Sequence, residues 1–486
     1  MEMLFNSIPF IILFPLTVII YYLIPKRFRF VWLLVVSYAF YFVQSQGFVL
    51  LLAASTIITY VTGVALANFD RTLIRKILVA CSVTLQLGIL FVFKYLDFSI
   101  GLMGSGLRFN LMLPLGISFY SFQAVSYIID VYRDKEKYEV NPLKLALYLS
   151  FFLSIVSGPI NRAGDILPQL CPADDISYDR TKQGVQKMLW GYFLKLAVAG
   201  RLAIVVDNVY ANTDNRSGTS VAIAALAYMF MLYCDFEGYS QIAIGSGYIL
   251  GIRMKENFRQ PFFSESMSEI WRRWHVSLST WFRDYLYIPL GGSRKGTVKK
   301  YINLIAVLFI SGIWHGANLT FFIWGALNGA FIVLGQMLTP MRDKLAGVLK
   351  GKICKSEGSS DRFDSVRIVL KRIGVYILFS YVFIYFASDS VKSAYLAIKA
   401  ILTRFSFAGF AEVTSLGLGR FNLALTLLMI VFVLIADGQA YKRNCDTPSL
   451  IRNVPTALRW AIYYALLIAI LFSANLSGKE FIYSKM

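Results

Sequence analysis

Histidine and cysteine are scarce in this 486-residue chain. It has two histidines, His275 and His315, and five scattered cysteines without a CxxC pair. Two histidines cannot build a three-histidine zinc site, no HExxH motif is present, and the cysteines suggest no disulfide framework. We therefore expect no bound metal. A GxSxG nucleophile motif is also missing, which argues against a serine acyl-enzyme.

Charged residues are few as well. They make up 16% of the chain against 57% hydrophobic residues, whereas soluble domains average about 25% charged. Several apolar runs contain no Lys, Arg, Asp or Glu and approach the length of a membrane span. These runs are 8–24, 48–69, 77–93, 219–234, 373–386, 421–435 and 460–476. The sequence predicts an all-α polytopic membrane protein with about ten spans, give or take about two.

The net charge of +20 raises the question of nucleic-acid binding, which we reject because the basic residues lie in loops between spans. Segment 253–300 holds ten Lys/Arg against four Asp/Glu, and segment 342–372 holds nine against four. Placing these loops in the cytoplasm satisfies the positive-inside rule and puts the N-terminus outside. No cleavable signal peptide is indicated, so the first apolar run is expected to be an anchor.

No stretch is large and polar enough to form a separate soluble domain. We expect one membrane-embedded domain over residues 1–486, with an interfacial segment at the cytoplasmic face, 253–300, and a cytoplasmic linker, 339–372. No repeat at a fixed period stands out, which weakens an inverted-repeat transporter.

Segment 258–292 combines aromatic and charged residues. Trp271, Trp274, Leu278 and Trp281 follow helical spacing, which predicts a short helix at or dipping into the membrane interface. Ser266 or Ser268 could cap it, and the Pro-Leu-Gly-Gly sequence at 289–292 would end it. The alternative is an interfacial aromatic belt with arginines that reach the headgroups.

His315 lies within a 37-residue stretch, 301–337, that has no Lys, Arg, Asp or Glu. Such a stretch can form two short spans or a broken pair, and glycines flank the histidine. An ionisable group inside a membrane segment costs several kcal/mol unless it faces protein or water, which favours a functional role. A neutral core histidine bonded to a carbonyl is the alternative.

Four stretches resemble the membrane-bound O-acyltransferases, and most closely the bacterial branch that acetylates alginate and related polysaccharides. They are LPLGISFYSFQ at 113–123, DFEGYS at 235–240 with ENF at 256–258, WRRWHVSLSTWFRDYLYIPLGG at 271–292, and GIWHG at 312–316. The C-terminal FIY at 481–483 and the chain length also fit. Three positions depart from the branch: Glu237, Gln241, and Asn328 where a further histidine is common.

The resemblance implies a ring of membrane helices around a thin centre, with re-entrant and interfacial helices. A cytosolic donor entrance would lead to the outer face. The family's characteristic histidine corresponds to His315 and its second polar position to His275. The resemblance also implies a bacterial inner-membrane location, a polysaccharide acceptor and an extracytoplasmic acetyltransferase partner.

Acyl transfer to a hydroxyl needs a base and stabilisation of an oxyanion. We expect His315 to be the base, shaped or oriented by Trp314 and Asn318, with Asn318 on the same face if that stretch is helical. His275 would orient the thioester or donate a hydrogen bond to the oxyanion. No cofactor is expected beyond the donor substrate, acetyl-CoA or an acylated carrier.

The basic residues of the long block, Arg272, Arg273 and Arg283, could bind the donor's phosphates or simply contact lipid headgroups. The remaining expected substrate- or donor-binding residues come from the matching stretches: Trp274, Asp284, Tyr285, Asp235, Tyr239 and Gln123.

Two alternative functions stay open. One is D-alanyl transfer to teichoic acid from a carrier protein. The other is a proton-coupled transporter using Asp130, Asp207 or Asp235.

Overall fold

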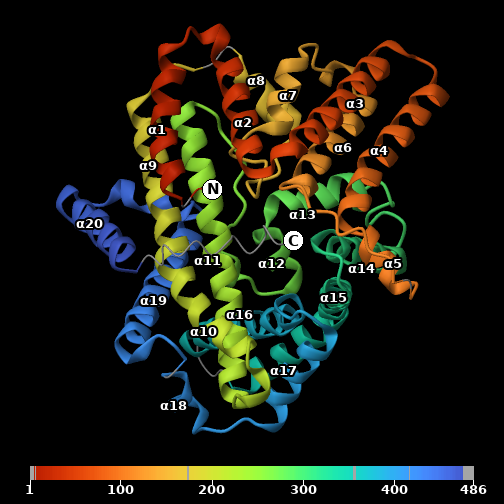
Figure 1. The fold of residues 1–486 in the computed structure, drawn as a ribbon. Coiled ribbons are helices and arrows are strands. Elements are labelled where there is room, and N and C mark those ends of the chain that lie inside the picture. Colours follow the sequence, from red (N-terminus) through yellow and green to blue (C-terminus); the bar gives the residue numbers. More distant parts are fainter. Residues whose placement is uncertain are drawn as a thin grey trace. The chain divides into compact units, whose positions relative to one another are not determined.

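A computed structural model describes the chain except for residues 1–4, 6, 105, 172–173, 354–356, 415 and 474–486. Side chains 357–359 are likewise outside the description. The FIY sequence at 481–483 therefore lies outside the described residues. Every regular element among the described residues is a helix (Figure 1). The predicted class, an all-α polytopic membrane protein, is confirmed.

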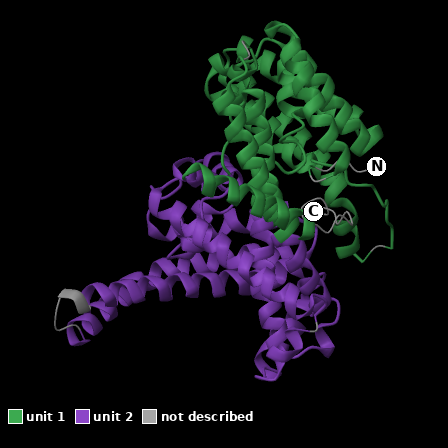
Figure 2. Ribbon diagram, turned by 90° about the vertical axis from the view of Figure 1, so that its left-hand side faces the viewer, with its two compact units in different colours: residues 1–197, 235–256, 455–486 green, residues 198–234, 257–454 purple. Residues whose placement is uncertain are grey.

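Two compact units divide the chain, and the single membrane-embedded domain expected over residues 1–486 stays a prediction. Unit 1 comprises 1–197, 235–256 and 455–486, and unit 2 comprises 198–234 and 257–454 (Figure 2). The long helix α11 (Gly218–Leu250) contributes to both, as does a π-helical segment, Phe193–Ala199.

Unit 1 is built around α6, whose side chains are buried from Ile117 to Ile128. Helices α3 and α4 pack on α6, and α7 packs on α2 and α3. The helices of unit 1 are α1 (Ile8–Leu23), α2 (Arg29–Ser45), α3 (Val49–Asn68), α4 (Thr72–Lys94), α5 (Leu96–Leu102), α6 (Ile117–Arg133), α7 (Pro142–Ser150), α8 (Ala163–Leu170), α9 (Tyr178–Tyr192) and α20 (Thr456–Ser473).

Small residues bring helices of unit 1 close together. A Cβ atom added at Gly191 on α9 would lie 2.6 Å from the carbonyl oxygen of Gly238 on α11, and one at Gly184 would lie 2.6 Å from that of Gly245. Between α3 and α4, Ser55 donates a hydrogen bond to Gln86 at 2.8 Å. Small interface residues and polar contacts between helices are typical of membrane-helix packing.

Unit 2 carries the two histidines. Helix α15 packs along α14 and also contacts α12, α16 and α17. The helices of unit 2 are α10 (Gly200–Tyr210), α12 (Met267–Arg273), α13 (Val276–Phe282), α14 (Thr297–His315), α15 (Leu319–Ile353), α16 (Glu357–Ala387), α17 (Val391–Thr403), α18 (Gly409–Val413) and α19 (Gly419–Arg443). A second π-helical segment, Arg283–Tyr287, follows α13.

Within the described part of the chain, nine helical stretches are long and apolar enough to cross a membrane, and α1 is a shorter apolar helix. This agrees with the predicted span count. One of the nine joins α2 and α3 in a single stretch, 26–68.

The predicted linker at 339–372 is wrong in its local structure. Helix α15 continues to Ile353 and α16 begins at Glu357, so most of the segment is helical. Opposite charges pair between the two helices, Lys350 with Asp364 and Arg367 with Asp343, each at 2.5 Å. The charges that suggested a solvated linker instead join two helices.

Candidate active site

The α14–α15 hairpin confirms the predicted break around His315. Helix α14 ends at His315 and α15 begins at Leu319, with extended backbone at Gly316. The two helices approach closely because glycines face each other. A Cβ atom on Gly312 would lie 2.3 Å from the carbonyl oxygen of Phe321, and one on Gly325 would lie 2.5 Å from that of Leu308. Glycine is needed at both positions.

His315 is buried, with 2% of its surface exposed. Three aromatic rings surround its imidazole edge-on, with ring centroids 5.0 Å away for Trp314, 5.0 Å for Trp324 and 5.3 Å for Phe386. As the last residue of α14, the imidazole lies at the negative end of the helix dipole. The three rings hold the imidazole in one place, and the C-terminal end of α14 favours a transient positive charge on it.

Asn318 does not share a helical face with His315, since the chain is not helical between Gly316 and Asn318. Its side-chain oxygen instead accepts a hydrogen bond from the backbone N–H of Thr320 at 3.1 Å, and its amide donates to the carbonyl oxygen of Asp389 at 2.8 Å. The shared face was expected only if this stretch were helical, and that condition is not met. Asn318 fixes the start of α15 instead.

A buried hydrogen-bond chain connects the aromatic block to α15. The indole Nε1–H of Trp271 donates to Oδ1 of Asn328 at 3.2 Å, and the amide of Asn328 donates to the carbonyl oxygen of Trp324 at 2.9 Å. The Trp271 and Trp324 rings are also in contact, 5.6 Å apart. Asn328, a departure from the family pattern, has this structural task.

The aromatic block is not one helix. Ser266 caps α12 by accepting a hydrogen bond from the N–H of Glu269 at 3.1 Å, as one of the two predicted caps. Helix α12 ends at Arg273, and α13 begins at Val276, because His275 adopts a left-handed backbone with φ 43°. The predicted continuous helical spacing through Trp281 is therefore wrong.

The tryptophans of this block are inside the protein. Trp271, Trp274 and Trp281 expose 9%, 1% and 7% of their surface. Trp274 packs on Phe379 of α16 at 5.5 Å, one of several edge-on aromatic contacts there. These side chains form protein core rather than an exposed aromatic belt at the membrane interface.

His275 is held by Asn257. Its Nδ1 lies 3.0 Å from Oδ1 of Asn257, and the same oxygen accepts hydrogen bonds from the backbone N–H and hydroxyl of Ser277 at 3.4 and 2.8 Å. A backbone N–H can only donate, so the side-chain atom of Asn257 that faces both Ser277 and His275 is the oxygen. Because this oxygen can only accept a hydrogen bond, Nδ1 of His275 must carry the proton. Nε2 of the neutral ring then presents a lone pair.

Burial lowers the pKa of His275 to about 3, because the charged ring would lose its hydration. The ring is therefore neutral at physiological pH and Nε2 accepts rather than donates a hydrogen bond. This argues against the expected role of His275 as an oxyanion donor, which needs an Nε2–H. It leaves the role of orienting a hydroxyl or thioester group.

The three arginines of the block have different surroundings. Arg273 is half-buried, pairs with Glu269 at 2.9 Å and lies over the Tyr441 ring at 4.7 Å, so it supports the fold. Arg283 pairs with the adjacent Asp284 at 2.8 Å. Arg272 is exposed. Tyr285, half-buried, packs on Trp281 at 5.2 Å.

The three other expected residues lie in unit 1. Gln123 and Tyr239 are buried, and Tyr239 stacks on Phe5 at 4.5 Å. Asp235 forms a buried ion pair with Lys195, which lies in the π-helical segment 193–199. A π-helical turn frequently marks a functional position.

Several residues of the histidine surroundings were not expected as site residues, namely Asn257, Trp324 and Phe386. Asn257 stood within the ENF sequence at 256–258, but nothing in the sequence indicated that it would contact His275. Among the residues described, no group of three or more His, Cys, Asp or Glu side chains could hold a metal ion.

Comparison with known proteins supplies the family context. The model of MBOAT, the membrane-bound O-acyltransferase family, matches residues 38–346, which include both histidines. The chain is 40% identical over 347 residues to a probable alginate O-acetylase AlgI of Pseudomonas putida, covering 69% of this chain and 71% of that protein. It is 30% identical over 344 residues to a peptidoglycan O-acetyltransferase of Helicobacter pylori, 63% of each chain. A teichoic acid D-alanyltransferase of Bacillus subtilis is 32% identical over 238 residues, 46% of this chain and 59% of that protein.

Proposed function

The chain belongs to the membrane-bound O-acyltransferase family, and from this membership we propose a specific reaction for it. It moves an acetyl group from a cytosolic thioester, acetyl-CoA, across the membrane to hydroxyls of a cell-surface or secreted polysaccharide. The observation that carries this proposal is the position of His315, buried among three aromatic rings at the break between two membrane helices.

His315 acts as the general base in this proposal. It takes the proton of the acceptor hydroxyl while the hydroxyl oxygen bonds to the thioester carbonyl carbon. The carbon–sulfur bond then breaks, and the proton passes to the departing thiolate. The aromatic rings fix the imidazole, and the C-terminal end of α14 stabilises the imidazolium that forms, by about 0.3–1 kcal/mol.

His275 has a positioning role in the proposal. Its Nδ1–H is directed to Asn257, so its Nε2 can accept a hydrogen bond from a substrate group. Arg272 and Arg283 are both exposed, but Arg283 pairs with Asp284, so Arg272 binds the donor phosphates in this proposal. Arg273 has a structural role because Glu269 already pairs with it.

The setting of the reaction is also proposed. The protein lies in a bacterial inner membrane with its N-terminus outside, since that orientation places the basic loops in the cytoplasm. An extracytoplasmic acetyltransferase partner receives the acetyl group where transfer to the polysaccharide is not direct.

Acetyl transfer is favoured over the alternatives. The match to the alginate O-acetylase covers 69% of the chain, and the match to the D-alanyltransferase covers 46%. Proton-coupled transport would need a free membrane carboxylate near the histidines. Of the three candidate carboxylates, Asp235 is neutralised by its ion pair with Lys195, which weakens the transporter alternative.

The test measures base-labile acetate in the cell envelope and secreted glycan of the native host. It compares the wild type, a deletion, His315→Ala and His275→Ala at equal membrane abundance, with Tyr464→Ala on α20, an exposed aromatic position, as a control. We expect ester content to fall to the deletion level in His315→Ala and to stay normal in the control. Unchanged ester in the deletion would rule out acetyl transfer, and D-alanyl esters and proton-coupled transport would be tested next.

A further inference from the structure

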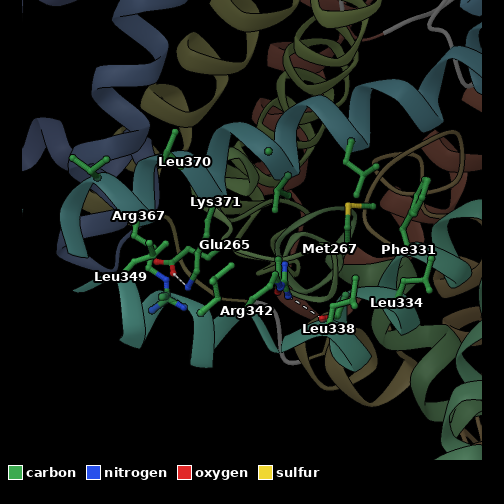
Figure 3. A pocket seen from close by; sticks show the side chains of 18 of the residues that line it. Glu265, Met267, Phe331, Leu334, Leu338, Arg342, Leu349, Arg367, Leu370 and Lys371 are labelled. Atoms are coloured by element: carbon green, nitrogen blue, oxygen red, sulfur yellow. Dashed lines mark hydrogen bonds and ion pairs between the residues drawn. The ribbon is translucent and has the colours of Figure 1, made fainter. Parts of the chain in front are cut away.

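An apolar groove of about 790 Å³ lies in unit 2 (Figure 3). It is lined by residues between 331 and 349 of α15, by residues between 363 and 378 of α16, and by the start of α12. Its apolar lining includes Phe331, Leu334, Leu338, Val375 and Leu378. It lies outside the aromatic surroundings of His315, and the proposed reaction assigns it no role.

The groove crosses a sharp change in polarity on both helices. On α15, residues 319–341 carry no Lys, Arg, Asp or Glu, and Arg342 is the first charge. On α16, Lys371 and Arg372 are the last charges before the uncharged run 373–387. Figure 3 shows Arg342 between Leu338, Leu334 and Phe331 on one side and Glu265, Lys371 and Arg367 on the other. Such a change on two adjacent helices marks the headgroup level of a membrane.

The cations of the groove are unequally neutralised. Arg367 pairs with Asp343 at 2.5 Å, and Lys371 lies 3.5 Å from Glu265. Arg342 donates to the carbonyl oxygen of Gly335 at 2.8 Å and to the hydroxyl of Thr339 at 3.0 Å. No carboxylate of the described residues pairs with Arg342. The groove therefore offers one exposed guanidinium, at the charged edge of an apolar floor.

We propose that this groove binds one anionic phospholipid, with its phosphate on Arg342 and an acyl chain along the apolar floor formed by Phe331, Leu334, Leu338, Val375 and Leu378. The long apolar floor fits an acyl chain, and the adjacent guanidinium fits a phosphate, whose oxygens can accept two hydrogen bonds from it. A headgroup with a net negative charge complements the exposed Arg342 guanidinium better than a zwitterionic headgroup does, because its phosphate charge is not offset by a choline or amine.

The bound lipid also contacts α12. Met267, the first residue of that helix, lines the groove, and Trp271 lies one turn further along. Trp271 joins α12 to α15 through its hydrogen bond to Asn328. The lipid, in contact with Met267, therefore supports the first turn of α12, next to this connection.

The first test measures binding of phosphatidylglycerol and of phosphatidylcholine with the same acyl chains to the purified full chain. Native mass spectrometry of protein released from nanodiscs of each composition counts the retained lipid. The variants are Arg342→Ala and Arg362→Ala. Arg362 is an exposed arginine on α16 that does not line the groove. We expect phosphatidylglycerol to be retained preferentially, and Arg342→Ala to weaken its binding by on the order of tenfold. Arg362→Ala should have no effect.

A second pair of variants tests the apolar floor. Gly335 lines the groove, and a Cβ atom there would meet nothing within 4 Å, so Gly335→Phe fills the groove without a clash at the backbone. Gly347→Phe is the matched control, because Gly347 is equally open on α15 but does not line the groove. We expect Gly335→Phe to remove the retained lipid and Gly347→Phe to leave it unchanged.

Three outcomes would overturn the proposal. The first is equal retention of the two lipids, and the second is retention unchanged by both Arg342→Ala and Gly335→Phe. The third is a dimer in mild detergent that Gly335→Phe dissociates, which would make a second copy of the chain the occupant. These readouts involve no acyl transfer, so they stand or fall separately from the proposed reaction.

Discussion

The indole N–H of Trp271 donates to the side-chain oxygen of Asn328 at 3.2 Å. Trp271 lies on α12, four residues before His275, and Asn328 lies on α15, one turn after Trp324, which packs on His315. This single buried hydrogen bond therefore joins the element that leads to one histidine with the element that supports the other.

Replacing Trp271 with phenylalanine should reduce stability by about 1–3 kcal/mol, because Oδ1 of Asn328 loses its donor while buried. Trp324→Phe is the matched control for the loss of an indole. Within the described structure the Trp324 N–H has no hydrogen-bond partner, so this variant loses ring volume alone. Thermal unfolding in detergent measures both. Equal destabilisation by the two changes would mean that the Trp271–Asn328 bond contributes nothing.

Glycine-to-alanine changes on the α14–α15 hairpin should have opposite signs at two positions. Gly312→Ala places a methyl group 2.3 Å from the carbonyl oxygen of Phe321, so the helices must separate, at a cost of roughly 1–3 kcal/mol. Gly335→Ala meets nothing within 4 Å and should stabilise the helix by about 0.5–1 kcal/mol. The melting temperatures of the two variants relative to wild type test this. Tolerance of alanine at Gly312 would contradict the close helix contact.

The break in the α14–α15 hairpin was predictable because its causes are local. An uncharged stretch too long for one span, with glycines beside the single histidine, indicates two helices and a break near Gly316. The cap of α12 is equally local, since Ser266 contacts the N–H only three residues later. In both cases the residues that cause the feature lie within a few positions of one another in the sequence.

The break at His275 depends on residues distant in sequence. The spacing of Trp271, Trp274 and Trp281 fits one helix, but the chain turns because Asn257 fixes both His275 and Ser277. The carbonyl oxygen of Asn257 also accepts a hydrogen bond from the N–H of Val276 at 2.8 Å. Hydrophobic periodicity does not report such a contact across 18 residues.

The helices at 339–372 were missed for a related reason. Their charges suggest a solvated segment when only the order along the chain is considered, yet Arg367 and Asp343 come together only once α15 and α16 pack against each other. Composition gives the number of charges and leaves out their partners.

Stability should depend on pH through His275. Its pKa in the folded protein, about 3, lies below the value of about 6.5 in an unfolded chain. Between these values the unfolded state binds more protons, so stability is fully present above pH 6.5 and decreases as the pH falls toward 3. From pH 7.5 to pH 5 the loss should be about 2 kcal/mol.

His275→Asn isolates this contribution. Asparagine tolerates the left-handed backbone, and its amide can replace Nδ1–H as the donor to Asn257. Unfolding of both proteins at pH 7.5 and pH 5 should show a smaller pH effect in the variant. The same pH effect in both would assign the acid sensitivity to other groups.

Arg272 and Arg273 are adjacent in sequence but should differ in phenotype. Arg273→Ala removes the ion pair with Glu269 and the contact with the Tyr441 ring, so it should lower stability by about 1–2 kcal/mol. Arg272→Ala removes an exposed side chain and should leave the melting temperature unchanged. If Arg272 binds donor phosphates, this variant should raise KM for acetyl-CoA several-fold with kcat little changed, because uniform binding is lost. Melting curves and kinetics on both variants separate the two roles, and an unchanged KM in Arg272→Ala would exclude Arg272 from donor binding.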